Sequence, residues 1–218
     1  MDIRFRHPAN TLLVGGSGAG KTTLMIKIVR ARAKLFDVKF DEIIWHFMEW
    51  QPCYQELSDS DDKVRFVEGV PNLDQFPSNE GPKLLICDDF MDVLNDPQFL
   101  KLAIKGSHHR NLSFWLLSQC IFPKNMREIS LQSHYCILMK TARDLAQVRS
   151  FVMQIDPLHW RALMEAWLDA TREGHSYLLF DFHVRQQDHL RLRTSILPDE
   201  TTVIYIPKGK YKNDMILK

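Results

Sequence analysis

A glycine-rich segment near the start of the sequence carries the clearest chemical signal. Residues 15–22 read GGSGAGKT and fit the pattern G-x-x-x-x-G-K-[ST], which cradles phosphates. Glycines let the backbone adopt positive φ angles and approach a phosphate without a Cβ atom in the way. The loop amides and the start of the following helix then donate hydrogen bonds to the anion. We therefore predict that nine residues hold a nucleoside triphosphate: Gly15, Gly16, Ser17, Gly18, Ala19, Gly20, Lys21, Thr22 and Thr23.

The last residues of this pattern have separate expected roles. Lys21 reaches the β and γ phosphates, and the Thr22 hydroxyl is a ligand of Mg²⁺. The flanking sequence suits such a loop, because residues 12–14 (LLV) read as a buried strand and residues 23–35 read as a helix. In that helix the apolar residues fall on one face. Strand, glycine loop and helix follow one another in the order that phosphate binding requires.

Two acids end the next strongly apolar segment. Residues 84–87 (LLIC) are followed directly by Asp88 and Asp89. A continuous apolar run is typical of a central parallel strand covered on both faces. Ligands in such sheets bind beyond the carboxyl ends of the strands. We expect Asp88 to be the Mg²⁺ carboxylate and Asp89 to activate the attacking water, although aspartates also end strands in ordinary turns.

Another buried strand, predicted for residues 112–117, ends in Ser118 and Gln119. Glutamine both donates and accepts hydrogen bonds, so Gln119 can contact the γ phosphate and the water together. Its alternative role is that of a cap for the next loop. Arg110, just before this strand, is a candidate for a transition-state arginine supplied by a neighbouring subunit. For Arg110 the alternative is a solvent-exposed loop arginine or a local salt bridge. Arg143 is a second candidate for the transition-state role, and the sequence does not separate the two.

The remaining chain predicts one α/β domain over residues 1–206 and a basic tail over 207–218. Further strands are expected at 41–47, 134–139 and 175–182. A helix is expected to open at Asp156–Pro157, with an apolar stripe that packs in the core. The acidic segment 56–63 is expected to be a solvated loop. The arginines of the late segment RQQDHLRLR are read as exposed strand residues or as contacts to nucleic acid phosphates: Arg185, Arg191 and Arg193.

Composition limits the classes of function. The 218 residues carry a formal net charge of +1, so there is no global basic field of the kind that small nucleic-acid binders have. The four cysteines show no C-x-x-C spacing, which indicates a reducing, intracellular setting. No apolar stretch is long enough for a membrane span, and we expect a soluble protein without a membrane partner.

The order of these parts resembles the genome-packaging ATPases of the FtsK–HerA superfamily, in particular those of large DNA viruses and of Polinton-type or adintovirus-like elements. The resemblance extends from about residue 10 to residue 194. The segment from His108 to Gln119 (HHRNLSFWLLSQ) is its most specific part. It implies an α/β P-loop NTPase fold: a three-layer sandwich around a mainly parallel sheet, with the additional-strand, RecA-like arrangement.

The same resemblance implies a function. Members of this family form rings, typically hexamers, hydrolyse ATP with Mg²⁺ and move double-stranded DNA into a preformed capsid. A capsid or portal-type protein is then a partner, and the site of virion assembly is the location. The roles of Lys21, Thr22, Asp88, Asp89 and Gln119 carry over residue by residue. Many members have glutamate where this chain has Asp89.

Two other classes of function remain open at this point. A small-molecule phosphotransferase, such as a nucleoside kinase, is built on the same loop. It should show an arginine-rich lid, whereas the arginines here are spread over several segments. A nucleotide-dependent binding module that acts as a slow switch is the third class. The paired acids argue against it, as does the lack of an N-K-x-D segment in the sequence.

Overall fold

The computed structural model describes residues 2–77, 80–94, 96–121 and 127–207. The C-terminal tail predicted for residues 207–218 lies outside the described residues from residue 208 onward. Within the described part, one sheet contains these strands: β1 (Asn10–Val14), β2 (Glu42–Phe47), β3 (Val64–Glu68), β4 (Lys83–Asp88), β5 (Leu112–Ser118), β6 (Tyr135–Met139), β7 (Tyr177–Asp181), β8 (Leu192–Thr194) and β9 (Val203–Ile204).

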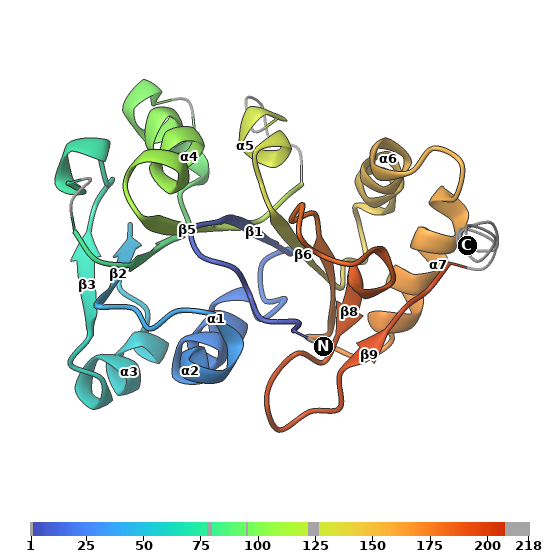
Figure 1. The fold of residues 1–218 in the computed structure, drawn as a ribbon, viewed down its shortest axis with the longest axis horizontal. Coiled ribbons are helices and arrows are strands. Elements are labelled where there is room, and N and C mark those ends of the chain that lie inside the picture. The colour runs from blue at the N-terminus through green and yellow to red at the C-terminus, as the bar shows by residue number, and fades with distance from the viewer. Residues whose placement is uncertain (1, 78–79, 95, 122–126, 208–218) are drawn as a thin grey trace, which may run out of the picture.

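Helices occupy the connections between these strands (Figure 1). The α-helices are α1 (Lys21–Arg30), α2 (Arg32–Leu35), α3 (Gln55–Ser60), α4 (Pro97–His109), α5 (Arg127–Leu131), α6 (Leu145–Ile155) and α7 (Trp160–Ala170). Short 3₁₀ turns are η1 (Pro52–Tyr54), η2 (Leu73–Gln75), η3 (Met91–Val93) and η4 (Asp188–Leu190). None of the helices in the described ranges combines the length and the apolar character that a membrane crossing requires.

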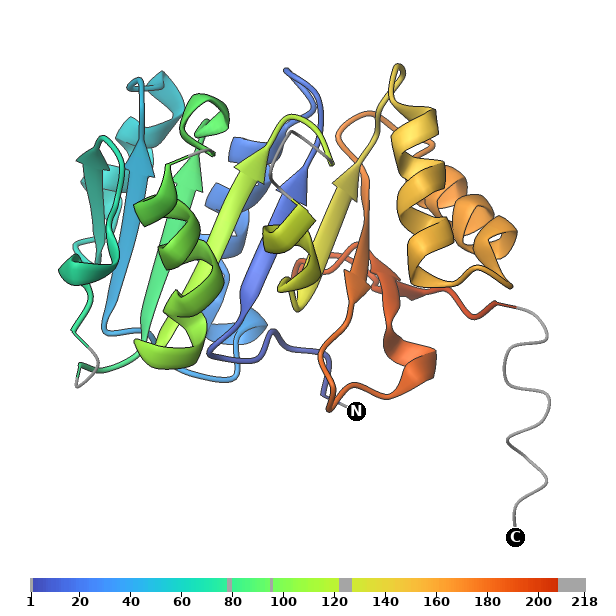
Figure 2. The ribbon, with the colours of Figure 1, turned by 90° about the horizontal axis from the view of Figure 1, so that it is seen from above.

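The sheet is mainly parallel, as predicted. Its strand order is β3-β2-β4-β5-β1-β6-β7-β8-β9, and the strands from β3 to β6 in this order run parallel. Strands β7, β8 and β9 complete it in antiparallel pairing. Strand β5 lies between β1, which leads into the glycine loop, and β4, which ends in the acids. This is the additional-strand arrangement that the family resemblance implies, and Figure 2 shows these parallel strands side by side.

Two apolar cores lie on opposite faces of the sheet. Side chains alternate between the faces of a strand, so Leu12 and Val14 join one core while Leu13 joins the other. Helices α4, α5, α6 and α7 pack on the first face. Helices α1, α2 and α3 pack on the second. The molecule is therefore the predicted three-layer sandwich, and its parallel strands are buried on both faces because helices cover both.

The helix predicted for residues 23–35 is interrupted. Helix α1 begins two residues earlier, at Lys21, and ends before Ala31, after which α2 forms a separate short turn. The Arg32 guanidinium donates to the Val29 carbonyl at 3.0 Å and also pairs with Asp61. The end of α1 thus has a side-chain partner for one of its last carbonyls.

The acidic segment 56–63 is not the loop that we expected. Residues Gln55–Ser60 form α3, because Leu57 is fully buried and anchors the segment against the second core. The Glu56 carboxylate also pairs with Arg30 of α1 at 2.8 Å. One buried leucine outweighs the polar composition of this segment.

The helix expected to open at Asp156–Pro157 begins three residues later than predicted, at Trp160. The Asp156 carboxylate accepts the backbone N–H groups of Leu158 and His159, which forms a turn before the helix rather than its cap. The predicted stripe does face the core, where Leu163 and Trp167 are buried.

The exposed placement predicted for the late arginines is wrong for Arg193. Its side chain is fully buried and pairs with the equally buried Asp181 at 2.8 Å. Arg191 folds back to donate to the Asp181 and His183 carbonyls. Arg185 is exposed. The cysteines are free, and Cys87 and Cys136 are buried as small apolar side chains in β4 and β6.

Candidate functional site

The parallel strands bring the predicted site residues to one edge of the sheet. In the register, Val14 pairs with Ser118 and Asp88 pairs with Leu117, so β1, β4 and β5 end at the same level. The Gly15 N–H donates to the Ser118 carbonyl at 3.1 Å. The glycine loop after β1, the acids after β4 and Gln119 after β5 therefore meet at this edge.

The glycine loop needs glycine at defined positions. Gly18 and Gly20 have φ angles of 73° and 96°, which side chains rarely allow. A Cβ atom on Gly15 would lie 2.9 Å from Met139 Cβ, and one on Gly20 would lie 2.9 Å from His175 Nδ1. No described side chain caps the start of α1, which leaves the amides of its first turn for an anion.

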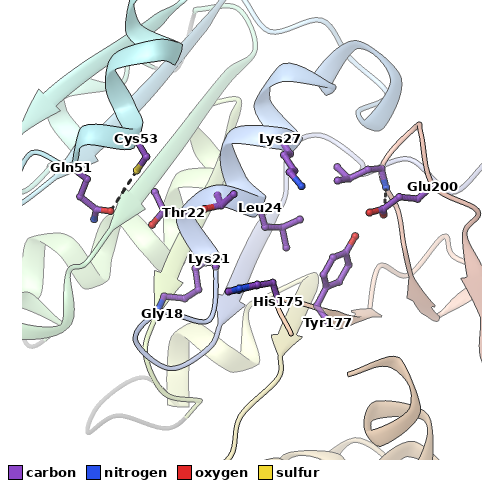
Figure 3. Close-up of a pocket in the computed structure, with 13 residues that line it drawn as sticks. Gly18, Lys21, Thr22, Leu24, Lys27, Gln51, Cys53, His175, Tyr177 and Glu200 are labelled. Atoms are coloured by element: carbon purple, nitrogen blue, oxygen red, sulfur yellow. Dashed lines mark hydrogen bonds between the residues drawn. The ribbon is translucent and has the colours of Figure 1, made fainter. Parts of the chain in front are cut away.

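Lys21 lies against the inside of this loop (Figure 3). Its ammonium group donates to the carbonyls of Gly15 at 2.7 Å and of Gly16 at 3.2 Å. Burial lowers the pKa of Lys21, whereas the charges of Asp88 and Asp89 act in the opposite direction. The cation is thus held beside the loop amides and near both acids, which is the position its predicted role needs.

Asp88 is bound by two hydroxyl groups. Thr22 Oγ1 and Tyr54 Oη each donate to Asp88 Oδ2 at 2.9 Å. Asp88 is 3% exposed, and burial raises the pKa of its carboxyl although the two hydroxyl donors and Lys21 oppose the rise. The hydrogen-bond partners of this carboxylate are neutral, and the nearby Lys21 makes no ion pair with it among the described residues, so a further cation can bind here.

The pair of Thr22 and Asp88 fits a magnesium ion. Mg²⁺ prefers oxygen ligands and is usually held by one or two protein oxygens together with substrate phosphates and waters. A hydroxyl and a carboxylate oxygen that already touch beside a phosphate loop are such a donor set. Among the described residues, no group of three or more His, Cys, Asp or Glu side chains could hold a metal ion on its own.

Asp89 and Gln119 face each other across the edge. Gln119 Nε2 donates to Asp89 Oδ1 at 3.1 Å, although the two residues lie 30 positions apart. Asp89 has a φ angle of 64°, a left-handed conformation that aspartate tolerates better than most residues. This turn separates the two acids: Asp88 points to α1, and the exposed Asp89 points to Gln119. A carboxylate and an amide side by side can orient one water molecule.

The two candidate arginines lie at opposite ends of the parallel strands. Arg143 follows β6, at the edge of the glycine loop, and is exposed. Arg110 precedes β5, whose seven residues separate it from Gln119 by more than about 20 Å. The Arg110 Nε atom is buried and finds no hydrogen-bond partner among the described residues. Arg110 therefore does not reach the phosphate site of its own chain.

The structure adds residues that the sequence patterns missed. Tyr54 comes from η1, in the connection after β2, and His175 Nδ1 contacts the Ala19 carbonyl at 3.1 Å. A cavity of about 450 Å³ opens beside the loop and is lined by Gly18, Gly20, Lys21, Thr22, Thr23, Leu24, Lys27, Gln51, Cys53, His175, Tyr177, Leu197 and Glu200. Leu24 and Lys27 come from α1, directly after the loop, whereas no local motif marks the other lining residues, which the fold brings to the loop from distant parts of the sequence.

No protein-family model and no curated protein matches this sequence. Among solved structures, the fold is similar to the genome-packaging NTPase B204 of Sulfolobus turreted icosahedral virus 2, solved in complex with ATP-gammaS. That match has 18% identity and a TM-score of 0.53, and it covers 92% of this chain and 98% of that chain. A KaiC-like protein of Pyrococcus horikoshii matches with 12% identity and a TM-score of 0.45, over 91% of this chain and 89% of that chain. The chain therefore has the P-loop NTPase fold, and the predicted resemblance to a viral packaging ATPase is confirmed at the level of the fold.

Proposed function

We propose that this chain is an ATPase that drives the packaging of double-stranded DNA into a viral capsid. One observation carries the catalytic half of the proposal: a phosphate loop, a Thr22–Asp88 pair and an Asp89–Gln119 pair meet at one edge of the sheet. These are the parts that hydrolysis of a nucleoside triphosphate needs.

The residues divide the chemistry between them. The loop amides and Lys21 bind the phosphates and stabilise the charge that develops on the transferred group. Thr22 and Asp88 hold Mg²⁺, which when bound neutralises phosphate charge. Asp89 accepts a proton from the attacking water, and Gln119 orients that water. The contact between Asp89 and Gln119 supports water as the nucleophile, since a carboxylate and an amide side by side can accept from and donate to one water molecule.

The DNA motor is supported by the fold. The similar structure named above is a genome-packaging NTPase. Arg110 lies too far from its own glycine loop to act there, so a role in catalysis requires a second copy of the chain in a ring. Arg143 is the other candidate for this contact. A ring, in our proposal a hexamer, would pass duplex DNA to a capsid or portal-type partner.

Two variants separate nucleotide binding from hydrolysis. Lys21→Ala removes the loop cation, and we expect loss of both ATP binding and turnover. Asp89→Asn removes the base but keeps the size and the contact with Gln119. It should therefore bind ATP as the unchanged protein does and show at least about a hundredfold lower turnover. Normal turnover by Asp89→Asn would show that another group activates the water.

Mixing experiments identify the arginine that acts between subunits. Arg110→Ala or Arg143→Ala protein is mixed with Asp89→Asn protein, after each is shown to assemble. A mixed interface can combine one intact base with one intact arginine, so activity should return for the arginine that acts across the interface. If neither mixture recovers activity, neither arginine has this role.

The decisive experiment is steady-state ATP hydrolysis with and without linear double-stranded DNA, across a salt series. A motor should be stimulated by duplex DNA, and the stimulation should fall as salt rises because phosphate contacts weaken. If the assembled protein hydrolyses ATP at the same rate with and without duplex DNA, the proposed motor function is contradicted. Transfer of phosphate to a small acceptor in place of water would identify a phosphotransferase.

A further inference from the structure

The cavity beside the glycine loop is larger than a phosphate site and changes character along its length. Its inner end is polar and is formed by the loop and the first turn of α1. Its outer end is formed by Leu24 and Lys27 of α1, Tyr177 at the start of β7, and Leu197 and Glu200 beyond β8 (Figure 3). Segments from the two ends of the described chain thus form one continuous pocket.

The strand order shows which end of this pocket lies near the residues that would act on the γ phosphate and which end lies away from them. The residues that would act on the γ phosphate follow β4 and β5, on one side of β1. Tyr177 begins β7, on the other side of β1 beyond β6, and it pairs with Met139 at the edge of the glycine loop. A nucleoside triphosphate with its γ phosphate at Asp88 therefore points its nucleoside toward Tyr177. In Figure 3, Gln51 and Cys53 lie on the opposite side of α1, next to Thr22.

The outer end has rigid apolar walls. Leu24, Tyr177 and Leu197 are 5%, 5% and 6% exposed. The Tyr177 hydroxyl accepts the Ile196 N–H at 3.0 Å, and the Tyr177 carbonyl accepts the Thr194 hydroxyl. The first contact fixes the ring where it borders the pocket, and the second fixes the backbone that carries it. An aromatic ring beside leucine side chains is a surface on which a flat base packs well.

The rim of this end carries one anion and one cation. Glu200 is exposed, and its Oε2 atom accepts the Leu197 N–H at 3.3 Å, which holds the carboxylate at the cavity. Lys27 is exposed on α1 across from it. A carboxylate accepts hydrogen bonds from an exocyclic amine, and an ammonium group donates to a ring nitrogen. Together they complement an amino-substituted base.

From this arrangement we propose that the outer end is the base subsite of the nucleotide, and that it takes an aminopurine, the adenine of ATP. The base packs against Tyr177 and Leu197, and its exocyclic amine donates to Glu200. This inference rests on the proposed function, because it assigns the second half of the same nucleotide. It makes Tyr177 and Glu200 determinants of nucleotide choice rather than of hydrolysis.

The test compares three ligands by calorimetric titration. Tripolyphosphate engages the glycine loop without a base. ATP adds the complete nucleoside, and purine riboside triphosphate adds the same ring system without the exocyclic amine. Glu200→Ala should weaken ATP binding about five- to tenfold, the loss of one good hydrogen bond. It should leave tripolyphosphate and purine riboside triphosphate within about twofold of the unchanged protein.

Variants of Tyr177 and Asp199 supply the matched controls. Tyr177→Leu removes the ring and should weaken both nucleotides about tenfold while sparing tripolyphosphate. Tyr177→Phe keeps the ring and should bind ATP almost as the unchanged protein does. Asp199→Ala removes a neighbouring exposed acid that does not line this cavity, and it should change nothing. Thermal unfolding checks that each variant folds. If Tyr177→Leu does not fold, Glu200→Ala still tests the base subsite, because Glu200 is exposed and its replacement leaves the core unchanged.

Each outcome supports or overturns a defined part of the account. Weaker ATP binding with unchanged tripolyphosphate binding supports the base subsite. Equal weakening of tripolyphosphate, or no change in ATP binding by folded Glu200→Ala, overturns it while the proposed ATPase stands. If the unchanged protein binds neither tripolyphosphate nor ATP, the proposed function itself fails.

Discussion

Two aspartates end strands of the same sheet, and both are buried: Asp88 closes β4 and Asp181 closes β7, with 3% and 1% of their surface exposed. Their partners differ. The Asp181 carboxylate binds the Arg193 guanidinium at 2.8 Å, the Gln186 amide at 2.9 Å and the His183 N–H at 3.0 Å. The Asp88 carboxylate binds two neutral hydroxyls and has no ion-pair contact within salt-bridge distance among the described residues.

The direction of the strands explains the difference. Strand β4 runs parallel to β1, so its last residue lies at the edge where the glycine loop begins. Strand β7 runs antiparallel to β6, and Asp181 pairs with Tyr135 at the opposite edge. A buried carboxylate that is paired with a buried cation, as Asp181 is with Arg193, has a structural role. A buried carboxylate with neutral partners, beside a phosphate loop, is where a metal ion can bind.

The largest expected effect comes from making the same substitution at both positions. Asp181→Asn should lower the free energy of unfolding by about 3–5 kcal/mol, because the Arg193 guanidinium is left buried without a counter-ion. Asp88→Asn should lower it by less than about 1 kcal/mol, or raise it, since burial already raises the pKa of this carboxyl and penalises its charge. Urea unfolding at neutral pH, without nucleotide or Mg²⁺, measures both.

The amide that Asp88→Asn introduces keeps a carbonyl oxygen that can accept from Thr22 and Tyr54, which makes this variant a clean removal of charge. Equal losses of stability in the two variants would mean that the hydroxyl donors stabilise Asp88 as well as an arginine stabilises Asp181. The distinction between a structural and a functional carboxylate would then be lost.

A smaller effect is expected when one donor to Asp88 is removed. Tyr54→Phe deletes the hydroxyl that donates to Asp88 Oδ2 and should lower the free energy of unfolding by about 1.5–3 kcal/mol, the range for hydrogen bonds to charged groups. Tyr205→Phe is the matched control. Its hydroxyl donates to Asp169 at 2.7 Å at an exposed position, so we expect a loss below about 1 kcal/mol.

Tyr54 also offers a second readout. Because Tyr54 and Thr22 bind the same oxygen of Asp88, loss of the phenol should loosen this carboxylate and raise the Mg²⁺ concentration needed for half-maximal ATP binding. If Tyr54→Phe lowered stability but left the Mg²⁺ requirement unchanged, Tyr54 would support the fold without positioning Asp88.

The smallest expected effect concerns the other aspartate. Gln186→Leu removes one amide donor from Asp181 while Arg193 remains, so we expect a loss of about 1 kcal/mol. Urea unfolding measures this loss beside that of Asp181→Asn. A loss as large as that of Asp181→Asn would show that Arg193 alone does not compensate the charge of Asp181.

The sequence predicts one of these aspartates much better than the other. Asp88 follows four apolar residues and comes after a glycine loop, so local patterns suggest both its strand and its role. The strand order then brings Thr22 and Asp88 within 2.9 Å, and Asp89 and Gln119 within 3.1 Å. Their catalytic roles stay predictions, but the contacts those roles require are present.

The environment of Asp181 and Arg193 could not be predicted in this way. In the segment HLRLRT the arginines alternate with leucines, a pattern typical of a strand with one exposed face. Arg193 is buried because a partner 12 positions away neutralises it, and no local pattern contains that partner. Tyr54 was missed for the same reason, since 34 positions separate it from Asp88. Contacts such as these, between residues far apart in the sequence, become visible only in the folded structure.

The most direct test of the account is the effect of Mg²⁺ on ATP binding, measured by calorimetry with Mg²⁺ or with EDTA for the unchanged protein and for Asp88→Asn. We predict that Mg²⁺ strengthens ATP binding at least about tenfold in the unchanged protein, because in our proposal Thr22 and Asp88, which are in contact with each other, would hold the ion beside the phosphates. In Asp88→Asn the same addition should change ATP binding less than about twofold. An equal effect of Mg²⁺ in both proteins would contradict the assignment of Asp88 as the metal carboxylate.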